Sequence, residues 1–191
     1  MYKRRRAPTK ERLNQVYGPE NYYSYLNSKE FKESCFKYIA DCIEEIGPNS
    51  SILEIGCGLC SLLGLLKNSH PYIGFDLSDV AVKNAKKIWE HREDTEIYVG
   101  DFETFLEYAP LSVDIVLSGN CLIHIKEELR EHFVEKYIVD TDAKYFIVYE
   151  LQSVDTGFMS RHKLVKKKNF YVDMPNLLEV KKKRKVEVYK V

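Results

Sequence analysis

The chain has 191 residues, of which 45% are hydrophobic and 30% charged, and these values are typical of a single globular domain. Its 29 basic and 29 acidic residues balance, which excludes binding to a polyanion through net charge alone. No apolar run is long enough to span a membrane, the basic start has no apolar segment behind it, and five cysteines lack the spacing of a disulfide framework, so we expect a cytoplasmic protein with reduced thiols.

The first 26 residues are predicted to form an N-terminal arm, and residues 27–191 the domain itself. The arm is basic at its start and contains the turn signal Gly18-Pro19. Tyr22, Tyr23 and Tyr25 follow, and they either form an aromatic lid or pack the first helix onto the sheet. A capping box at residues 27–30 predicts a helix that ends before Gly47-Pro48.

After residue 50, short apolar runs alternate with helical patterns. The predicted strands are Ser51–Ile55, Tyr72–Asp76, Glu96–Val99, Val113–Leu117 and Lys144–Tyr149. The helical patterns between them are Leu62–Lys67, Val80–His91, a short piece around Phe102–Tyr108, and Glu127–Val139. Such alternation predicts a mostly parallel sheet with helices on both faces. Two further alternating segments, Lys163–Val172 and Glu179–Val191, predict an antiparallel hairpin at the sheet edge.

The stretch from Ile52 to Ser61 predicts a buried strand that turns sharply into a helix at the carboxyl edge of the sheet. Gly56 and Gly58 permit positive φ angles and let a ligand approach the bare backbone. The loop amides and the start of the helix offer donors to a polar or anionic ligand.

Three acids are expected along this edge, at the ends of consecutive strands. They are Glu54, Asp76 and Asp101. A carboxylate at the end of the second strand can accept both hydroxyls of a ribose. An acid beside an aromatic residue, as in Asp101-Phe102, suits an adenine, since it offers an acceptor for the amino group and a ring edge for the base.

These segments resemble, in order and spacing, the motifs of class I S-adenosylmethionine-dependent methyltransferases. The matching segments are Glu54-Ile55-Gly56-Cys57-Gly58, Gly74-Phe75-Asp76, Gly100-Asp101-Phe102 and residues 113–125. The resemblance implies a Rossmann-like domain with a seven-stranded sheet, S-adenosyl-L-methionine as cofactor, and methyl transfer as the reaction. One departure is Cys60, which stands where many members of the family have a third glycine.

The resemblance also implies roles for individual residues. The loop of Gly56, Cys57 and Gly58 would lie under the methionine part of the cofactor and be ordered by Glu54. Asp76 with Leu77 would hold the ribose, and Asp101 with Phe102 the adenine. Ser118 and Asn120 would border the methyl group and the acceptor.

Two rival interpretations of the glycine loop have less support. A nicotinamide dinucleotide would need a glycine at position 61, where this chain has Ser61, and it gives no role to Asp101. Cys57 and Cys60 form a Cys-x-x-Cys, but a zinc site needs a second pair of ligands at matching spacing, and none is present. We therefore expect no metal, and we expect both cysteines to fill space in the loop.

The sequence defines the residues around the methyl acceptor less clearly than those around the cofactor. The candidate catalytic residues are His124, Asn120 and Glu150. His124 is either a general base or a residue that caps or packs the next helix, and Asn120 lines the site. Glu150 is a base, an acid that binds a cation, or a rim carboxylate exposed to water. The Asn-Pro-Pro-aromatic tetrad of nucleobase amine methyltransferases is absent from residues 118–121, so we expect the acceptor to be an oxygen or nitrogen of a small molecule.

Other functions stay open because both ends of the chain are basic. From Arg161 onward there are eleven Lys and Arg against three Asp and Glu. A nucleic-acid or protein methyltransferase would use these ends, and a module that binds the cofactor without catalysis is a further alternative. The runs Lys166–Lys168 and Lys181–Lys185 lack interleaved aromatic residues, so we interpret both as solvated faces.

Overall fold

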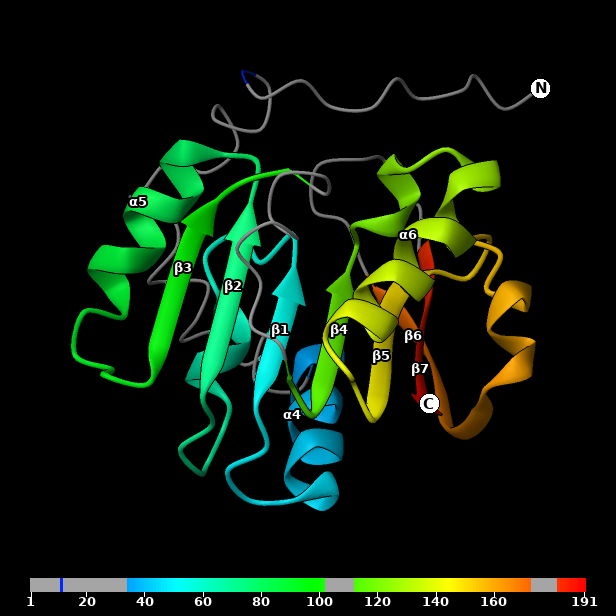
Figure 1. Ribbon diagram of the computed structural model, residues 1–191, viewed down its shortest axis with the longest axis horizontal. Coiled ribbons are helices and arrows are strands. Elements are labelled where there is room, and N and C mark those ends of the chain that lie inside the picture. Colours follow the sequence, from blue (N-terminus) through cyan, green and yellow to red (C-terminus); the bar gives the residue numbers. More distant parts are fainter. Residues whose placement is uncertain (1–10, 12–33, 102–111, 173–181) are drawn as a thin grey trace.

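The computed structural model describes residue 11 and residues 34–101, 112–172 and 182–191. Its centre is one seven-stranded sheet with the order β3-β2-β1-β4-β5-β7-β6 (Figure 1). The strands are β1 Ile52–Ile55, β2 Tyr72–Asp76, β3 Thr95–Val99, β4 Ile115–Gly119, β5 Tyr145–Leu151, β6 Lys163–Val172 and β7 Lys182–Lys190. The first five strands pair in parallel, and β7 is antiparallel to both β5 and β6. The predicted parallel sheet with a terminal hairpin is confirmed.

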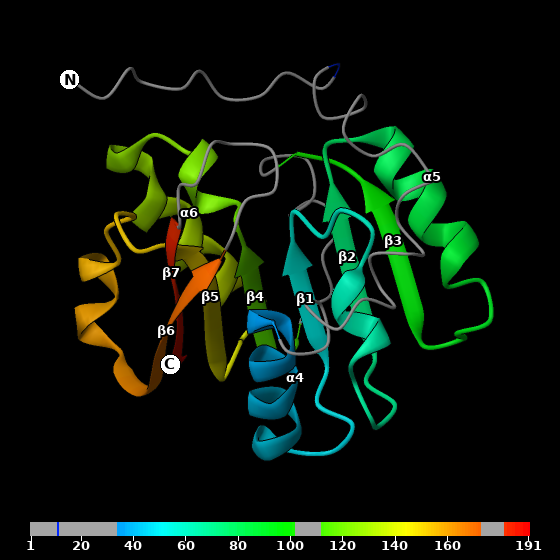
Figure 2. The same cartoon turned by 180° about the vertical axis from the view of Figure 1, so that it is seen from behind.

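Helices cover both faces of the sheet (Figures 1 and 2). They are α4 Cys35–Ile46, α5 Asp79–Ile88 and α6 Glu127–Asp140, with the short 3-10 helices η2 Ser61–Gly64, η4 Leu122–His124 and η5 Gly157–Arg161. The cores match this arrangement, since α4, α5 and η2 share one cluster of buried residues and α6 with η5 the other. No helix in the described part of the chain is long and apolar enough to cross a membrane.

The strands are buried on both faces because helices lie on both sides of them. Every residue of β1 is buried, and successive side chains alternate between the two cores. Ile52 and Ile115 face α4, whereas Leu53 and Val116 face α6. A continuous apolar run is therefore the expected signature of these central strands.

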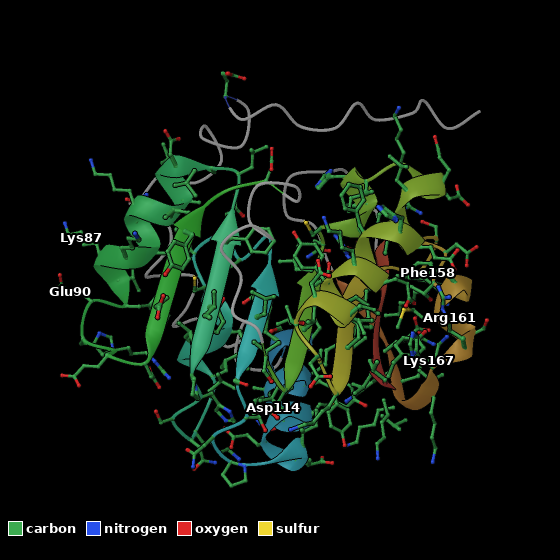
Figure 3. The ribbon with its side chains drawn as sticks, in the orientation of Figure 1. Lys87, Glu90, Asp114, Phe158, Arg161 and Lys167 are labelled. Carbon is green, nitrogen blue, oxygen red and sulfur yellow. The ribbon has the colours of Figure 1, made fainter. Side chains whose placement is uncertain are left out.

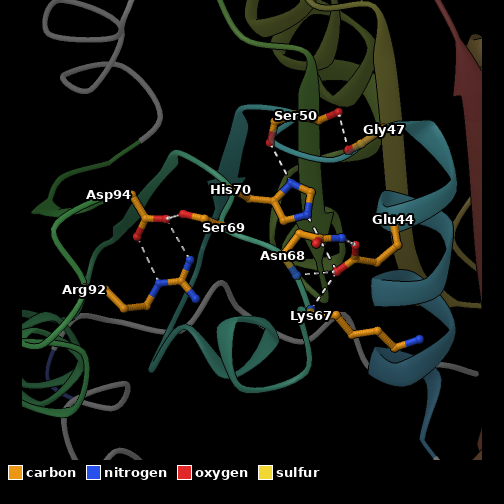
Figure 4. A network of polar contacts seen from close by, with 9 residues as sticks. All are labelled: Glu44, Gly47, Ser50, Lys67, Asn68, Ser69, His70, Arg92 and Asp94. Carbon is orange, nitrogen blue, oxygen red and sulfur yellow. Dashed lines mark hydrogen bonds and ion pairs between the residues drawn. The ribbon is translucent and has the colours of Figure 1, made fainter.

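The helical pattern at Leu62–Lys67 proves shorter than predicted, because only η2 forms there. The amides of Lys67 and Asn68 donate instead to the carboxylate of Glu44 in α4, at 2.6 and 3.1 Å. Figure 4 shows that these contacts hold the segment at Lys67 and Asn68 next to α4. The predicted capping box at 27–30 lies outside the described residues, and Ser34 caps the described start of α4 by accepting from the Phe36 amide at 3.3 Å.

The interpretation of Lys181–Lys185 as a solvated face is wrong for Lys185, which is 6% exposed. Its ammonium lies 3.1 Å from the Glu187 carboxylate and donates to the Thr156 hydroxyl at 2.6 Å. That hydroxyl donates in turn to Glu187 at 2.7 Å. Lys167 of β6 binds the other oxygen of Glu187 at 2.6 Å. A complete set of partners therefore permits these charges to be buried.

Candidate active site

The loop after β1 depends on its two glycines. Gly56 and Gly58 have φ angles of 68° and 54°, in the left-handed region. A Cβ atom on Gly56 would lie 2.8 Å from the sulfur of Cys121, so no larger side chain fits there. The amides of Gly56 and Cys57 both donate to the carbonyl of Phe75, at 2.9 and 3.0 Å, which joins the loop to β2.

Cys60 adopts the left-handed conformation that the third glycine of the motif would favour, with φ 55° and ψ 43°. Its side chain is completely buried. The loop therefore keeps a glycine-like path at this position with a thiol inside it. Burial raises the pKa of the neighbouring Cys57 thiol well above its usual value, so this thiol stays protonated and unreactive.

Asp76 joins the glycine loop to the start of α5. One carboxylate oxygen accepts from the Gly58 amide at 2.9 Å and the other from the Ser78 amide at 2.8 Å. Burial raises the pKa of this carboxyl above its ordinary value, and the two amide donors oppose that rise. Each carboxylate oxygen has a second lone pair, so Asp76 can still accept from ligand hydroxyls.

Glu54 is buried beneath the loop. The hydroxyl of Tyr72 donates to its carboxyl group at 2.5 Å. Burial raises the pKa of Glu54 to about 8, and the nearby Asp76 adds to the rise. At neutral pH the group is therefore mostly protonated and uncharged.

The proposed adenine end of the site lies at the carboxyl end of β3. Asp101 is exposed there, and the preceding Gly100 donates to the Asp76 carbonyl at 3.0 Å, which holds the two strand ends together. Leu77 is 37% exposed, so its apolar surface is available to a ligand. Phe102 lies outside the described residues, as do Tyr22, Tyr23 and Tyr25.

The end of β4 presents Ser118 and Asn120. The Ser118 hydroxyl is buried and has no hydrogen-bond partner in the described part of the chain. Asn120 has a φ of 56°, and its amide donates to the Tyr149 carbonyl at 2.7 Å, so β5 holds the turn in its strained conformation.

Glu150, near the end of β5, is completely buried beside this turn. One of its oxygens accepts from the Leu122 amide at 2.7 Å, whereas Oε2 has no partner among the described residues. Burial raises its pKa to about 7, although backbone donors and the charge of Arg184 oppose the rise. The alternative of a water-exposed rim carboxylate is therefore wrong.

His124 lies on the surface, at the end of η4, and its side chain is exposed. The structure thus places Ser118, Asn120 and Glu150 at the ends of adjacent strands and leaves His124 outside that group. Arg130 of α6 fixes the turn by donating to the carbonyls of Leu122 and Ile125, at 2.9 and 3.2 Å.

Two residues of this region were not predicted. Arg184 of β7 donates to the side-chain oxygen of Asn120 and lies over the ring of Tyr149, with 5.6 Å between its central carbon and the ring centroid. Arg184 belongs to a lysine-rich run, and Tyr149 to an apolar strand, so neither has a local signal that could have found it.

The described residues contain no group of three His, Cys, Asp or Glu side chains placed to hold a metal ion. Asp114, just before β4, lies at the opposite, amino edge of the sheet (Figure 3). There it pairs with Lys144 at 2.6 Å and accepts from Ser51.

Comparison with known proteins agrees with this geometry. The sequence pattern of a family described as a methyltransferase domain matches residues 52–138, which contain the glycine loop, Asp76, Asp101 and the end of β4. Residues 52–138 thus resemble a methyltransferase domain, and the fold agrees with that of class I S-adenosylmethionine-dependent methyltransferases. The protein is therefore an enzyme, and S-adenosylmethionine is the methyl donor of its class.

Several solved structures share the methyltransferase fold. Magnesium protoporphyrin IX methyltransferase from Synechocystis PCC 6803, with bound SAH, is 13% identical, and the match covers 95% of this chain and 93% of that one with a TM-score of 0.67. A TehB-like SAM-dependent methyltransferase from Corynebacterium glutamicum is 20% identical over 90% and 97% of the two chains, with a TM-score of 0.60.

A protein from Pyrococcus horikoshii described as a candidate RNA methyltransferase is 13% identical over 95% of this chain and 97% of that one, with a TM-score of 0.62. A comparison with curated protein sequences gives no match. At these identities the structural matches establish the fold, and the acceptor has to be inferred from the site itself.

The described residues of the methyltransferase site fit the cofactor. The left-handed glycines leave the backbone of the loop bare, Asp76 keeps lone pairs free, and the buried Ser118 hydroxyl lacks a partner at the end of β4. A polar ligand across these strand ends would give that hydroxyl a partner.

Proposed function

We propose that this enzyme transfers the methyl group of S-adenosylmethionine to an oxygen or nitrogen atom of a small molecule. The supporting observation is the buried Glu150, which follows the β5 residue paired with Gly119 at the end of β4 and whose Oε2 has no partner among the described residues. A protonated nucleophile must lose its proton during methylation, and a carboxyl group with a pKa of about 7 is matched to accept it.

The cofactor would lie across the carboxyl ends of β1, β2 and β4 and supply an electrophilic methyl group. Gly56, Cys57 and Gly58 would pass beneath its methionine part, with Glu54 as their support. Asp76 and Leu77 would bind the ribose, Asp101 and Phe102 the adenine, and Ser118 would border the sulfonium. These residues contribute mainly by aligning the donor with the nucleophile and excluding water.

The contacts of the basic residues favour a small acceptor over nucleic acid. In β6, Lys166 pairs with Glu45, Lys167 pairs with Glu187, and Lys168 lies over the rings of Tyr38 and Phe170, at 4.9 and 5.3 Å from their centroids. Three basic side chains that would otherwise be available to bind a phosphate backbone therefore already have partners within the protein.

Nucleic-acid methylation is the alternative, because one structural neighbour is described as a candidate RNA methyltransferase. A fluorescence anisotropy titration with short RNA and DNA duplexes distinguishes the two. We expect no submicromolar binding at physiological salt. Tight binding with a steep salt dependence, which reflects released counterions, would instead favour the nucleic-acid acceptor.

The cofactor assignment predicts that Asp76→Ala and Asp101→Ala each weaken binding of S-adenosylhomocysteine by about 1–3 kcal/mol, the usual cost of removing one partner of a polar contact. Isothermal titration calorimetry measures the affinity. Asp114→Ala is the matched control, since this acid lies at the opposite edge of the sheet and should leave the affinity unchanged. Tight binding of NAD with none of S-adenosylhomocysteine contradicts the assignment.

The acceptor is found by labelled-methyl transfer over fractions of a cell extract. We expect the label in a small-molecule fraction, and we expect it to require the purified enzyme. Label that appears only in the RNA or protein fraction would overturn the small-molecule proposal while leaving the methyltransferase activity in place.

A further inference from the structure

Arg184 extends the acceptor side of the site from a strand that the other site residues do not use. In the antiparallel pairing of β5 with β7, Arg184 lies opposite Leu151, the last residue of β5. Its side chain reaches back over the Tyr149 ring and donates to the side-chain oxygen of Asn120. A guanidinium group is thereby fixed at the carboxyl edge, beside the turn that borders the methyl group.

This cation lacks a counterion within the described part of the chain. Its hydrogen-bond partner Asn120 is neutral, and no described carboxylate lies within ion-pair distance of it. Its Nε is buried without a hydrogen-bond partner. Glu150 feels the charge, which lowers its pKa against the effect of burial, but the two groups form no ion pair.

The start of α4 adds to the positive potential there. Phe36, in the first turn of α4, packs edge-on against Tyr149, with 5.6 Å between the ring centroids. The amino end of α4 therefore lies close to the ring that Arg184 covers. The charge of Arg184 also acts on the thiol of Cys35, the first residue of α4. A helix start and an unpaired guanidinium both attract an anion.

A half-buried arginine without an anion is unfavourable in an isolated protein, because desolvation of the charge is not compensated. We propose that Arg184 binds an anionic oxygen group of the methyl acceptor, so that the substrate is an acid such as a carboxylate or a phosphate. This inference rests on the proposed small-molecule function and narrows it to one class of substrate.

Anchoring the acid group at Arg184 would direct the rest of the acceptor toward Asn120 and the donor. The positive charge would also favour the ionised carboxylate of Glu150 and so keep the proposed base ready. Arg184 is thus a specificity-determining residue that contacts the acceptor outside the reacting atoms.

The test uses the full-length protein saturated with S-adenosylhomocysteine and titrated at constant ionic strength. The probes are benzoate, inorganic phosphate and the uncharged benzamide, and the readouts are calorimetry and the shift in melting temperature. We expect benzoate or phosphate to bind at least about tenfold more tightly than benzamide, and which of the two anions binds identifies the acid group.

The decisive variant is Arg184→Gln, which keeps a donor for Asn120 and removes the charge. It should weaken anion binding by about 10- to 100-fold and leave the affinity for S-adenosylhomocysteine unchanged. Arg184→Lys keeps the charge but lacks the planar guanidinium group, so its anion affinity should fall less than that of Arg184→Gln. Arg161→Gln is the control, since this exposed arginine of η5 (Figure 3) pairs with Glu131 and Glu135 of α6 and should change nothing.

Three outcomes would overturn the inference. They are a wild-type protein without preference for either anion, an Arg184→Gln variant with unchanged anion affinity, and a variant that loses affinity for S-adenosylhomocysteine itself. The last would assign Arg184 to the carboxylate of the cofactor. A wild-type protein that does not bind S-adenosylhomocysteine would instead contradict the proposed function, so the two failures are distinguishable.

Discussion

At the scale of single residues, burial separates two candidate bases that the sequence presents equally. His124 and Glu150 both follow a predicted strand of the same sheet, but Glu150 is completely buried and His124 is exposed. A buried carboxyl has a raised pKa because its charged form is poorly solvated. The carboxyl group of Glu150 lies at the end of β5, beside the turn after β4, so the geometry favours Glu150.

Glu150→Gln should lower kcat by about 10²–10⁴-fold, the usual contribution of a general base. The amide oxygen of Gln can still accept from the Leu122 amide, so the turn and the binding of S-adenosylhomocysteine should be preserved. The measurement is labelled-methyl transfer to the acceptor identified in extract, together with its pH dependence. Because the base must be deprotonated, the wild-type rate should rise with pH through about 7.

His124→Gln is the control for this variant, and it should stay within a few-fold of wild type because the side chain is exposed. A large loss in His124→Gln with normal turnover in Glu150→Gln would reverse the assignment. Normal turnover in both variants would mean that alignment alone drives the transfer.

At the scale of elements, the sequence predicts what local pattern determines and misses what strand register determines. The central strands are found to within about two residues because both of their faces are buried, which leaves continuous apolar runs. The start of α5 is also local, since Ser78 caps this helix by accepting from the Ala81 amide at 3.1 Å. The predicted helix at Leu62–Lys67 fails because Glu44, distant in the sequence, captures the amides that would continue it.

Arg184 could not be predicted either, because strand register and not local sequence brings it to the site. Within Lys181–Lys185 nothing separates Arg184 from its neighbours, and only the pairing of Leu151 with Arg184 places it beside Asn120. The next residue, Lys185, is buried on the opposite face of the sheet because side chains alternate along a strand. The register of a hairpin thus decides which residue of a charged run becomes part of the site.

The loop after β1 is the element whose shape the site needs most, and Gly56→Ala tests it. A Cβ there would require a left-handed alanine and would collide with Cys121, so we expect a loss of about 2 kcal/mol or more in the free energy of unfolding. The same shift should weaken binding of S-adenosylhomocysteine at least about tenfold. Urea unfolding and calorimetry measure the two effects.

Gly64→Ala, in the neighbouring η2, is the matched control. Gly64 is not among the glycines with positive φ, and the nearest atom to its added Cβ is the Trp89 ring at 3.3 Å. We expect a change in stability of less than about 1 kcal/mol and no change in affinity. Equal effects of the two substitutions would show that the left-handed geometry of the loop is unimportant.

At the scale of the whole molecule, two buried carboxyl groups make stability depend on pH in opposite ways. Glu187 has its pKa lowered to about 2, because donors from Lys167, Thr156 and Lys185 outweigh the effect of burial. Its stabilisation is present above the unfolded pKa near 4.5 and is lost as the pH falls toward 2. It therefore stabilises the attachment of the β6–β7 hairpin only when ionised.

Glu54 acts in the other direction, because burial raises its pKa to about 8. Its folded-state proton favours the native protein below the unfolded value of 4.5, and this contribution is lost as the pH rises from 4.5 through 8. Glu150, with a pKa of about 7, adds to the same decline. The protein without cofactor should therefore be most stable at about pH 5 and lose stability on both sides.

Urea unfolding of the cofactor-free protein between pH 3 and 8 measures this profile, with a slope of at most about 1.4 kcal/mol per pH unit for each group. Glu54→Gln should flatten the decline above pH 5 and leave the acid side unchanged, because Gln cannot ionise and can still accept from Tyr72. Glu187→Gln should flatten the acid side alone. A wild-type stability that rises steadily from pH 5 to 8 would contradict the protonated state of Glu54, and with it the view that an uncharged acid supports the glycine loop.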